Sequence, residues 1–164
     1  MLFRSIKKKI IFRAFNTFKG LSHRNEIFYK KGEIIFINDS KATTFNSAQH
    51  TLRNNKNIFW IVGGVPKLGD IFNLRSLSKN IKKAYIIGKK INYFKNQIGK
   101  AVKYKSSFNL ENAVQDIFKD LVFFKKKQAI VLLSPASASY DQFKDFTERG
   151  NQFKKLILKY AKKF

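Results

Sequence analysis

Short apolar segments alternate with longer amphipathic segments along most of this chain, and this alternation constrains its fold more than any other feature. The apolar segments are typical of buried strands, and they are residues 33–38, 58–62, 84–87 and 129–133, with a weaker one at 102–105. The segments between them predict helices at residues 46–54, 74–83, 93–100 and 110–124, and one or two helices within 141–163. Strands and helices in this order predict right-handed βαβ units. We therefore expect an α/β fold with a mostly parallel sheet flanked by helices.

Three polar segments follow predicted strands directly, at residues 39–44, 63–70 and 134–139. In a parallel sheet, ligands bind beyond the carboxyl ends of the strands. We therefore expect these three loops to converge on one edge of the sheet. The first 31 residues do not fit the alternating pattern. There we expect a helix at residues 5–18, followed by a loop that approaches the next domain.

Composition indicates one globular domain with a sizeable core. Of the 164 residues, 44% are hydrophobic and 27% are charged, and the 18 phenylalanines predict a core rich in aromatic rings. The lack of cysteine excludes disulfides and Cys-ligated metal sites, and it fits a reducing compartment. The apolar runs are shorter than the ~20 residues that a membrane-spanning helix needs. The N-terminus lacks the pattern of a signal peptide.

The net charge of +24 has two interpretations. A partner such as nucleic acid or an anionic membrane surface would explain it. Compositional drift would also explain it, because Lys, Asn, Ile and Phe are enriched together and all have A/T-rich codons. A nucleic-acid-binding protein usually gathers its basic residues on one face, whereas the basic residues here are mostly lysines spread from Lys7 to Lys163. We favour drift.

Common catalytic motifs are missing from the sequence. There is no GxxxxGK[ST] phosphate-binding loop and no GxSxG nucleophile elbow. The nearest fragment to a phosphate loop, at residues 64–69, lacks the glycine spacing and the hydroxyl that would meet magnesium. With only His23 and His50, a histidine metal cluster is not expected, and we predict no metal site.

Four segments together resemble a known enzyme family. They are FKGLSHRNE at 18–26, NDSKAT at 38–43, WIVGGVPKLGD at 60–70 and LLSPASASYDQFKDFTERG at 132–150. In this order they resemble the D-glutamate-adding members of the Mur ligase family, over residues 15–160. The resemblance implies that residues 32–164 form a Rossmann-like C-terminal domain that binds the amino acid. Residues 1–31 would be the end of the central ATPase domain and the linker, without the family's phosphate loop, modified lysine and most magnesium ligands.

The resemblance also implies an activity and a set of partners. The family couples D-glutamate to UDP-N-acetylmuramoyl-L-alanine in cytoplasmic peptidoglycan synthesis, with ATP and magnesium. ATP phosphorylates a carboxylate, and the D-glutamate amine then attacks the acyl phosphate. Magnesium would be held mostly by the part of the enzyme outside this chain. We therefore expect a cytoplasmic ligase domain that is inactive without the uridine-nucleotide and ATPase domains.

The same resemblance assigns residues to two sites. The residues matching ATP contacts are His23, Arg24 and Asp39. The residues matching D-glutamate contacts are Lys41, Thr43, Lys67, Ser139 and Phe146. The lysines make chemical sense, because D-glutamate brings two carboxylates into a partly dry pocket. An arginine suits phosphate because its guanidinium is planar and always charged.

Simpler interpretations remain open for each of these residues. Asp39 and Ser40 could cap the following helix, and Gly63-Gly64 could form only a tight turn. Lys41 and Lys67 could be two surface lysines among many, and Phe146 could be ordinary core. The sequence departs from the family pattern mildly at Ser22, Thr44 and Ser137. For the whole chain, a basic nucleic-acid-binding module or an inert remnant on the same fold are the alternatives.

Overall fold

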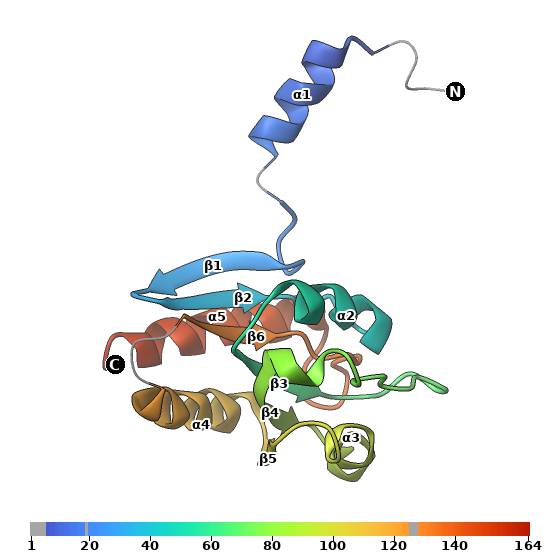
Figure 1. Ribbon diagram of the computed structural model, residues 1–164, viewed down its shortest axis with the longest axis vertical. Coiled ribbons are helices and arrows are strands. Elements are labelled where there is room, and N and C mark those ends of the chain that lie inside the picture. The colour runs from blue at the N-terminus through green and yellow to red at the C-terminus, as the bar shows by residue number, and fades with distance from the viewer. Residues whose placement is uncertain (1–5, 19, 125–127) are drawn as a thin grey trace.

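A computed structural model describes residues 6–18, 20–124 and 128–164 of the chain. These residues form a six-stranded sheet with the strand order β1-β2-β6-β3-β4-β5 (Figure 1). The strands are β1 (Glu26–Lys31), β2 (Ile34–Asn38), β3 (Ile58–Gly63), β4 (Ile81–Ile87), β5 (Tyr104–Phe108) and β6 (Ala129–Leu133). The helices are α1 (Lys8–Thr17), α2 (Phe45–Asn54), α3 (Ile91–Ile98), α4 (Leu110–Phe123) and α5 (Phe146–Ala161), with a short 3-10 turn η2 (Ser78–Asn80).

The pairing of the strands confirms the predicted fold class. Strands β2, β6, β3, β4 and β5 are all parallel, and only β1 runs antiparallel, against β2. Strand β6 comes last along the chain but lies between β2 and β3. The loops that follow β2, β6 and β3 are therefore neighbours at one edge of the sheet, which is the arrangement that places a ligand site in such folds.

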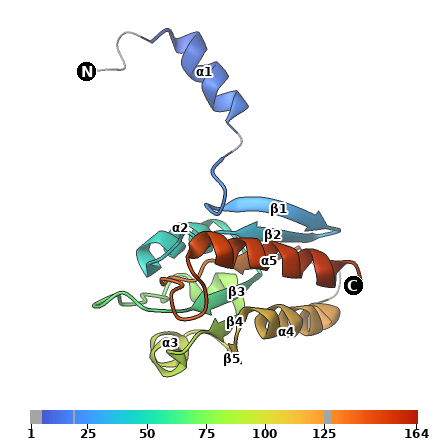
Figure 2. The same cartoon turned by 180° about the vertical axis from the view of Figure 1, so that it is seen from behind.

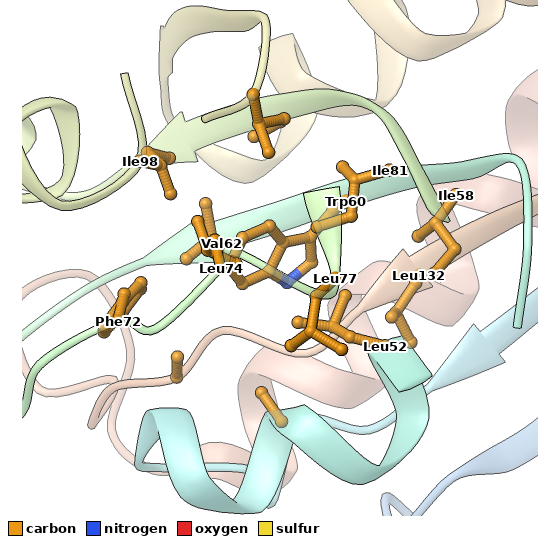
Figure 3. Close-up of a cluster of buried hydrophobic side chains, with 14 of the residues drawn as sticks. Leu52, Ile58, Trp60, Val62, Phe72, Leu74, Leu77, Ile81, Ile98 and Leu132 are labelled. Carbon is orange, nitrogen blue, oxygen red and sulfur yellow. The ribbon is translucent and has the colours of Figure 1, made fainter. Parts of the chain in front are cut away.

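Alternate side chains of the strands pack on opposite faces of the sheet, as the two-residue period of a strand requires. On one face, Trp60 and Val62 pack with α2, α3 and the 72–77 segment (Figure 3). On the other face, Phe59 and Ile61 pack with α4 and α5, which lie next to each other when the molecule is seen from behind (Figure 2). The sheet is thus covered on both sides, which explains why its central strands are apolar throughout.

The helices that flank the site begin at capping side chains that satisfy otherwise unpaired backbone N–H groups. The Thr44 side chain accepts from Ser47 N at the start of α2, and the Asp145 side chain accepts from Glu148 N at the start of α5. Asp39 therefore does not cap the helix that follows it, so that simpler interpretation of its role is wrong. No described helix is long and apolar enough to cross a membrane.

The prediction of a helix at residues 74–83 is wrong. This segment is a loop that ends in η2 and then continues directly into β4. Leu74 and Leu77 have the spacing of a helix, but both fill the core beside Trp60. The Asn80 side chain donates to the carbonyls of Leu52 and Arg53 at the end of α2, which fixes the turn. Tertiary packing has overridden a pattern that alone favours a helix.

The first part of the chain differs from expectation in one respect. Helix α1 is present, within the range expected for it, although residue 5 lies outside the described residues. Strand β1 was not expected, and its hairpin with β2 turns at residues 32–33. The boundary expected between residues 31 and 32 thus falls in that turn. Helix α1 buries no residue and lies away from the sheet (Figures 1 and 2).

Candidate functional site

The three loops beyond β2, β6 and β3 are joined by backbone hydrogen bonds, as their predicted convergence requires. Asp39 N donates to Leu133 O at 2.8 Å, and Gly63 N donates to Pro135 O at 3.0 Å. Val65 and Ala138 exchange two bonds, of 2.9 and 3.0 Å, which add an isolated antiparallel bridge. The loops therefore form one connected surface.

Gly63 and Gly64 have backbone conformations and close contacts that require glycine at both positions. Their φ angles are +129° and +137°, a region that side-chain-bearing residues rarely adopt. A Cβ on Gly63 would overlap the backbone of Ile87, and a Cβ on Gly64 would overlap Ala138 and the Ser137 side chain. Gly64 therefore allows the loop after β3 to lie directly against the loop after β6, and Gly63 allows it to approach the end of β4.

Asp39 is buried and joins three separate segments. One carboxylate oxygen accepts from Asn25 N at 3.1 Å, and the other accepts from the hydroxyls of Thr51 at 3.2 Å and Ser134 at 2.8 Å. Burial raises the pKa of Asp39 above its usual value, although these hydrogen bonds and the charge of Arg24 oppose that rise. A carboxylate has about four acceptor positions, so one remains for a ligand hydroxyl.

His23 lies beneath this surface rather than on it. Its side chain is 6% exposed and its φ is +64°. Asn38 Nδ2 lies 2.9 Å from His23 Nδ1, and the ring of Phe146 meets the imidazole edge-on. Burial and the nearby charge of Lys154 lower the pKa of His23. At neutral pH the imidazole is therefore neutral and acts through packing and hydrogen bonding.

A cavity of about 170 Å³ opens between the Asp39 loop and α2. Its lining residues are Arg24, Asn25, Asp39, Lys41, Ala42, Ser47, His50 and Thr51. Three of the eight predicted site residues, Arg24, Asp39 and Lys41, thus share one cavity, which combines two basic side chains with a carboxylate. Its volume is below the 300–1,000 Å³ of a typical small-molecule site.

The wall beside this cavity holds Lys41 and Phe146 together. The Lys41 ammonium lies 3.7 Å from the centroid of the Phe146 ring, within the range of a cation–π interaction. Ser40 Oγ donates to the Phe146 carbonyl at 2.8 Å, which fixes the start of α5 against the loop after β2. Phe146 is half-buried and has a specific contact with a site lysine, in addition to any role in packing.

The remaining predicted residues lie on the same loops, and within the described part of the chain no hydrogen bond or ion pair joins them to the residues above. Ser139 is buried and starts a turn in which its carbonyl accepts from Gln142 N and Phe143 N. Thr43 is half-buried, and Lys67 is exposed on the 63–70 loop. Within the described residues there is no group of three or more His, Asp or Glu side chains that could hold a metal ion.

Arg149 is the residue of this site that the sequence analysis missed. Its side chain is 1% exposed, yet it carries a charge. Burial lowers the pKa of its guanidinium to about 10, so it stays protonated at neutral pH. A signal was present in the sequence, because Phe146, Arg149, Phe153 and Leu156 recur at helical spacing and Arg149 therefore lies on the buried face of α5.

Comparison with known proteins identifies relatives of the chain. No protein-family model matches it. It is 42% identical over 142 residues to the UDP-N-acetylmuramoylalanine–D-glutamate ligase of Bartonella henselae, which covers 87% of this chain and 30% of the relative. The ligase of Rhizobium meliloti is 43% identical over 148 residues, covering 90% of this chain and 32% of the relative. The ligase of Wolbachia sp. subsp. Brugia malayi is 38% identical over 159 residues, covering 97% and 32%.

The chain therefore spans about a third of the length of the curated relatives that it matches. The matched region includes nearly all of this chain, and with it every loop of the site described above. Through that third, the chain belongs to the family of UDP-N-acetylmuramoylalanine–D-glutamate ligases.

Proposed function

We propose that this chain is the C-terminal, amino-acid-binding domain of a cytoplasmic ATP-dependent ligase that adds D-glutamate to UDP-N-acetylmuramoyl-L-alanine. The observation that carries the proposal is the joining of three strand-end loops into one surface that bears Lys41 and Lys67, with Ser139 buried in the loop after β6. The similarity to ligases of that name supports the choice of reaction. In this proposal, residues 1–31 lead from the central domain to the ligase domain of residues 32–164, and β1 is the part of this leading segment that joins the sheet of the ligase domain.

The role of this domain is to hold the amino acid. ATP supplies an acyl phosphate on the L-alanyl carboxylate. The D-glutamate amine attacks the carbonyl carbon, phosphate leaves and the amine loses a proton as the amide forms. Lys41 and Lys67 pair with the carboxylates of D-glutamate, and Thr43 and Ser139 donate hydroxyl hydrogen bonds. Phe146 keeps the Lys41 ammonium in place. Holding the amine at the acyl phosphate accelerates the reaction through proximity.

The nucleotide side of the proposal rests on the cavity beside Asp39. Arg24 contacts phosphate, and Asp39 accepts a hydrogen bond from one ribose hydroxyl through its remaining acceptor position. His23 supports this loop from below through Asn38. Among the described residues no group of three or more carboxylate or histidine side chains would hold magnesium, so in this proposal the metal is bound mainly by the rest of the ligase.

The test is D-glutamate-dependent phosphate release from ATP in the presence of UDP-N-acetylmuramoyl-L-alanine. The chain is assayed alone and mixed with a separately made fragment that carries the uridine-nucleotide and ATPase domains. We expect release only in the mixture, and its loss with Lys67→Ala. The matched control is Lys56→Ala, because Lys56 is exposed just before β3 starts, at the opposite end of the sheet. Absence of release from a mixture of folded components would contradict the proposal.

The net charge of +24 supports a second candidate function, a nucleic-acid-binding module. Binding through phosphate contacts weakens steeply as salt concentration rises. A DNA or RNA titration at two salt concentrations distinguishes the two functions. Tight, salt-dependent binding together with no phosphate release in the ligase assay would favour this second function.

A further inference from the structure

Arg149 is a buried arginine that makes no direct ion pair with any described residue, and it lies between two loops of the proposed D-glutamate site. Its Nε donates to Ser40 Oγ at 3.0 Å, and its Nη2 donates to the carbonyls of Ser40 at 2.8 Å and Ser137 at 3.0 Å. Among the described residues, no carboxylate lies within 4.0 Å of the guanidinium. The third nitrogen, Nη1, is buried and has no hydrogen-bond partner in the described part of the chain.

This arrangement is unfavourable for stability alone. A buried charge needs a partner to offset its loss of hydration, and an unpaired buried N–H group adds a further cost. Nearly all buried arginines in proteins are paired with a carboxylate or phosphate. An aliphatic side chain could fill the same volume without either cost. The position therefore needs a reason beyond packing.

The hydrogen-bond partners of Arg149 supply that reason. Ser40 directly precedes Lys41, and its hydroxyl continues the chain of bonds to the Phe146 carbonyl. Ser137 lies two residues before Ser139 on the loop after β6. One guanidinium thus holds the loops after β2 and β6 at a fixed separation, and both loops carry residues proposed to contact D-glutamate.

We propose that Arg149 is a positioning residue for the amino-acid site. It sets the distance between the Lys41 and Ser139 loops. Among the described residues its charge has no direct ion pair and meets only the more distant charge of Asp141, so it favours binding of a dicarboxylate. This inference rests on the proposed function. Arginine reaches these three acceptors from two separated nitrogens of a planar fork, whereas the three N–H groups of lysine radiate from one nitrogen and cannot span the same positions.

The experiment measures D-glutamate binding to the full chain by NMR, following backbone amide signals of residues 39–44 and 134–139. Only folded molecules give these dispersed signals, so the Kd obtained from them does not depend on the folded fraction. Wild type is compared with Arg149→Lys and Ser40→Ala. The matched control is Arg53→Ala, which removes an exposed arginine from the end of α2.

We expect Arg149→Lys to raise the Kd for D-glutamate roughly tenfold or more, since it retains the charge but loses the fork. Ser40→Ala keeps the arginine and removes one acceptor, so we expect a smaller increase, and Arg53→Ala should bind as wild type does. If Arg149→Lys does not fold, Ser40→Ala carries the test.

The experiment distinguishes failure of the proposed function from failure of the inference about Arg149. If wild type shows no shift in either loop at saturating D-glutamate, the proposed function fails and this inference fails with it. If wild type binds D-glutamate and the folded variants bind it equally well, the proposed function stands. In that case Arg149 is only a structural connection between loops.

Discussion

At the scale of single residues, the stability of the loop around His23 depends on whether the His23 imidazole is neutral or protonated. The imidazole is enclosed between Asn38, Phe146 and α5, and Lys154 is close enough to lower its pKa further. The backbone of His23 also fixes the loop, because its N–H donates to Glu26 at 3.0 Å and its carbonyl accepts from Lys41 N at 3.0 Å. Protonation of this ring would place a charge where burial and a nearby cation oppose it.

We predict that His23 makes the chain less stable below neutral pH. Its folded-state pKa lies below the unfolded value near 6.5. Between those two values the unfolded state binds more protons, so the free energy of unfolding falls as pH decreases from about 7 to 5. Urea titrations across this range should show the loss. His23→Asn tolerates the positive φ and should flatten the slope, whereas His50→Gln, at an exposed histidine, should keep it.

Asp39 permits a second prediction, which separates the effect of the side chain's shape on stability from the effect of its charge. Because burial raises its pKa, the ionised carboxylate costs stability at pH values above that pKa. Asp39→Asn removes the charge and can still bond to Asn25 N and to the two hydroxyls, so its free energy of unfolding at pH 7 should stay within about 1 kcal/mol of wild type.

Asp39→Ala leaves those donors without an acceptor and should cost about 3 kcal/mol. Urea titration at pH 7 checks both variants. Asp145→Ala, which removes only the N-cap of α5, provides the comparison, at a cost of about 1 kcal/mol. Equal losses for Asp39→Asn and Asp39→Ala would contradict this account of the charge.

At the scale of elements, the sequence predicted those parts whose pattern and packing agree. Strands β2, β3 and β6 are apolar and central, and α4 has a clear apolar face, so local pattern alone located them. The 74–83 segment has helical spacing, but its conformation is fixed by the hydrogen bond of Asn80 to α2 and by burial beside Trp60. These contacts join residues that are distant in the sequence, so the pattern of the segment alone does not reveal them. Strand β1 mixes polar and aromatic residues at a sheet edge, where burial imposes a weaker pattern.

The candidate site likewise has parts that the sequence predicted and one part that required the structure. The convergence of its loops followed from strand order, and the identity of its charged residues came from resemblance to a family. Arg149 could not be assigned without the structure, because its three acceptors are Ser40 and Ser137 atoms that are distant in sequence. A charged residue on a buried helix face indicates that a partner exists, but it does not say which one.

Gly150 gives a prediction at the level of helix α5. Alanine usually stabilises a helix interior relative to glycine, by about 1 kcal/mol. Here a Cβ would overlap the His23 ring and would lie 3.0 Å from Asn38 Oδ1. Overpacking of this kind costs about 1–3 kcal/mol, so Gly150→Ala should destabilise the chain or leave it unchanged.

The neighbouring exposed position supplies the control, since Asn151→Ala should stabilise α5 slightly through propensity alone. Thermal unfolding of both variants provides the measurement. A gain of about 1 kcal/mol with Gly150→Ala would mean that α5 does not approach the His23 loop as closely as the structure shows.

At the scale of the whole molecule, α1 buries none of its residues against the other described parts of the chain. The helix is amphipathic, and Ile10, Phe15 and Phe18 at its end are 59%, 73% and 63% exposed. It belongs to the region shared with the ligases, because the alignment with the Wolbachia relative covers 159 of 164 residues. Those ligases are about three times as long as this chain. We therefore expect the apolar face of α1 to pack against the remainder of the enzyme.

The last prediction follows from this exposed face. Contiguous apolar surface on an isolated chain promotes association, so the chain alone should self-associate as its concentration rises, as measured by light scattering. The double variant Phe15→Ser, Phe18→Ser should remain monomeric. It should also bind the fragment carrying the other two domains at least tenfold more weakly, because each buried phenylalanine contributes about 1.5–3 kcal/mol. The control variant Val122→Ser, Phe123→Ser removes two exposed apolar side chains at the end of α4, away from α1 and from the site loops, and should leave fragment binding unchanged. A wild-type chain that stays monomeric at high concentration, with fragment binding unaffected by the α1 changes, would show that α1 has another role.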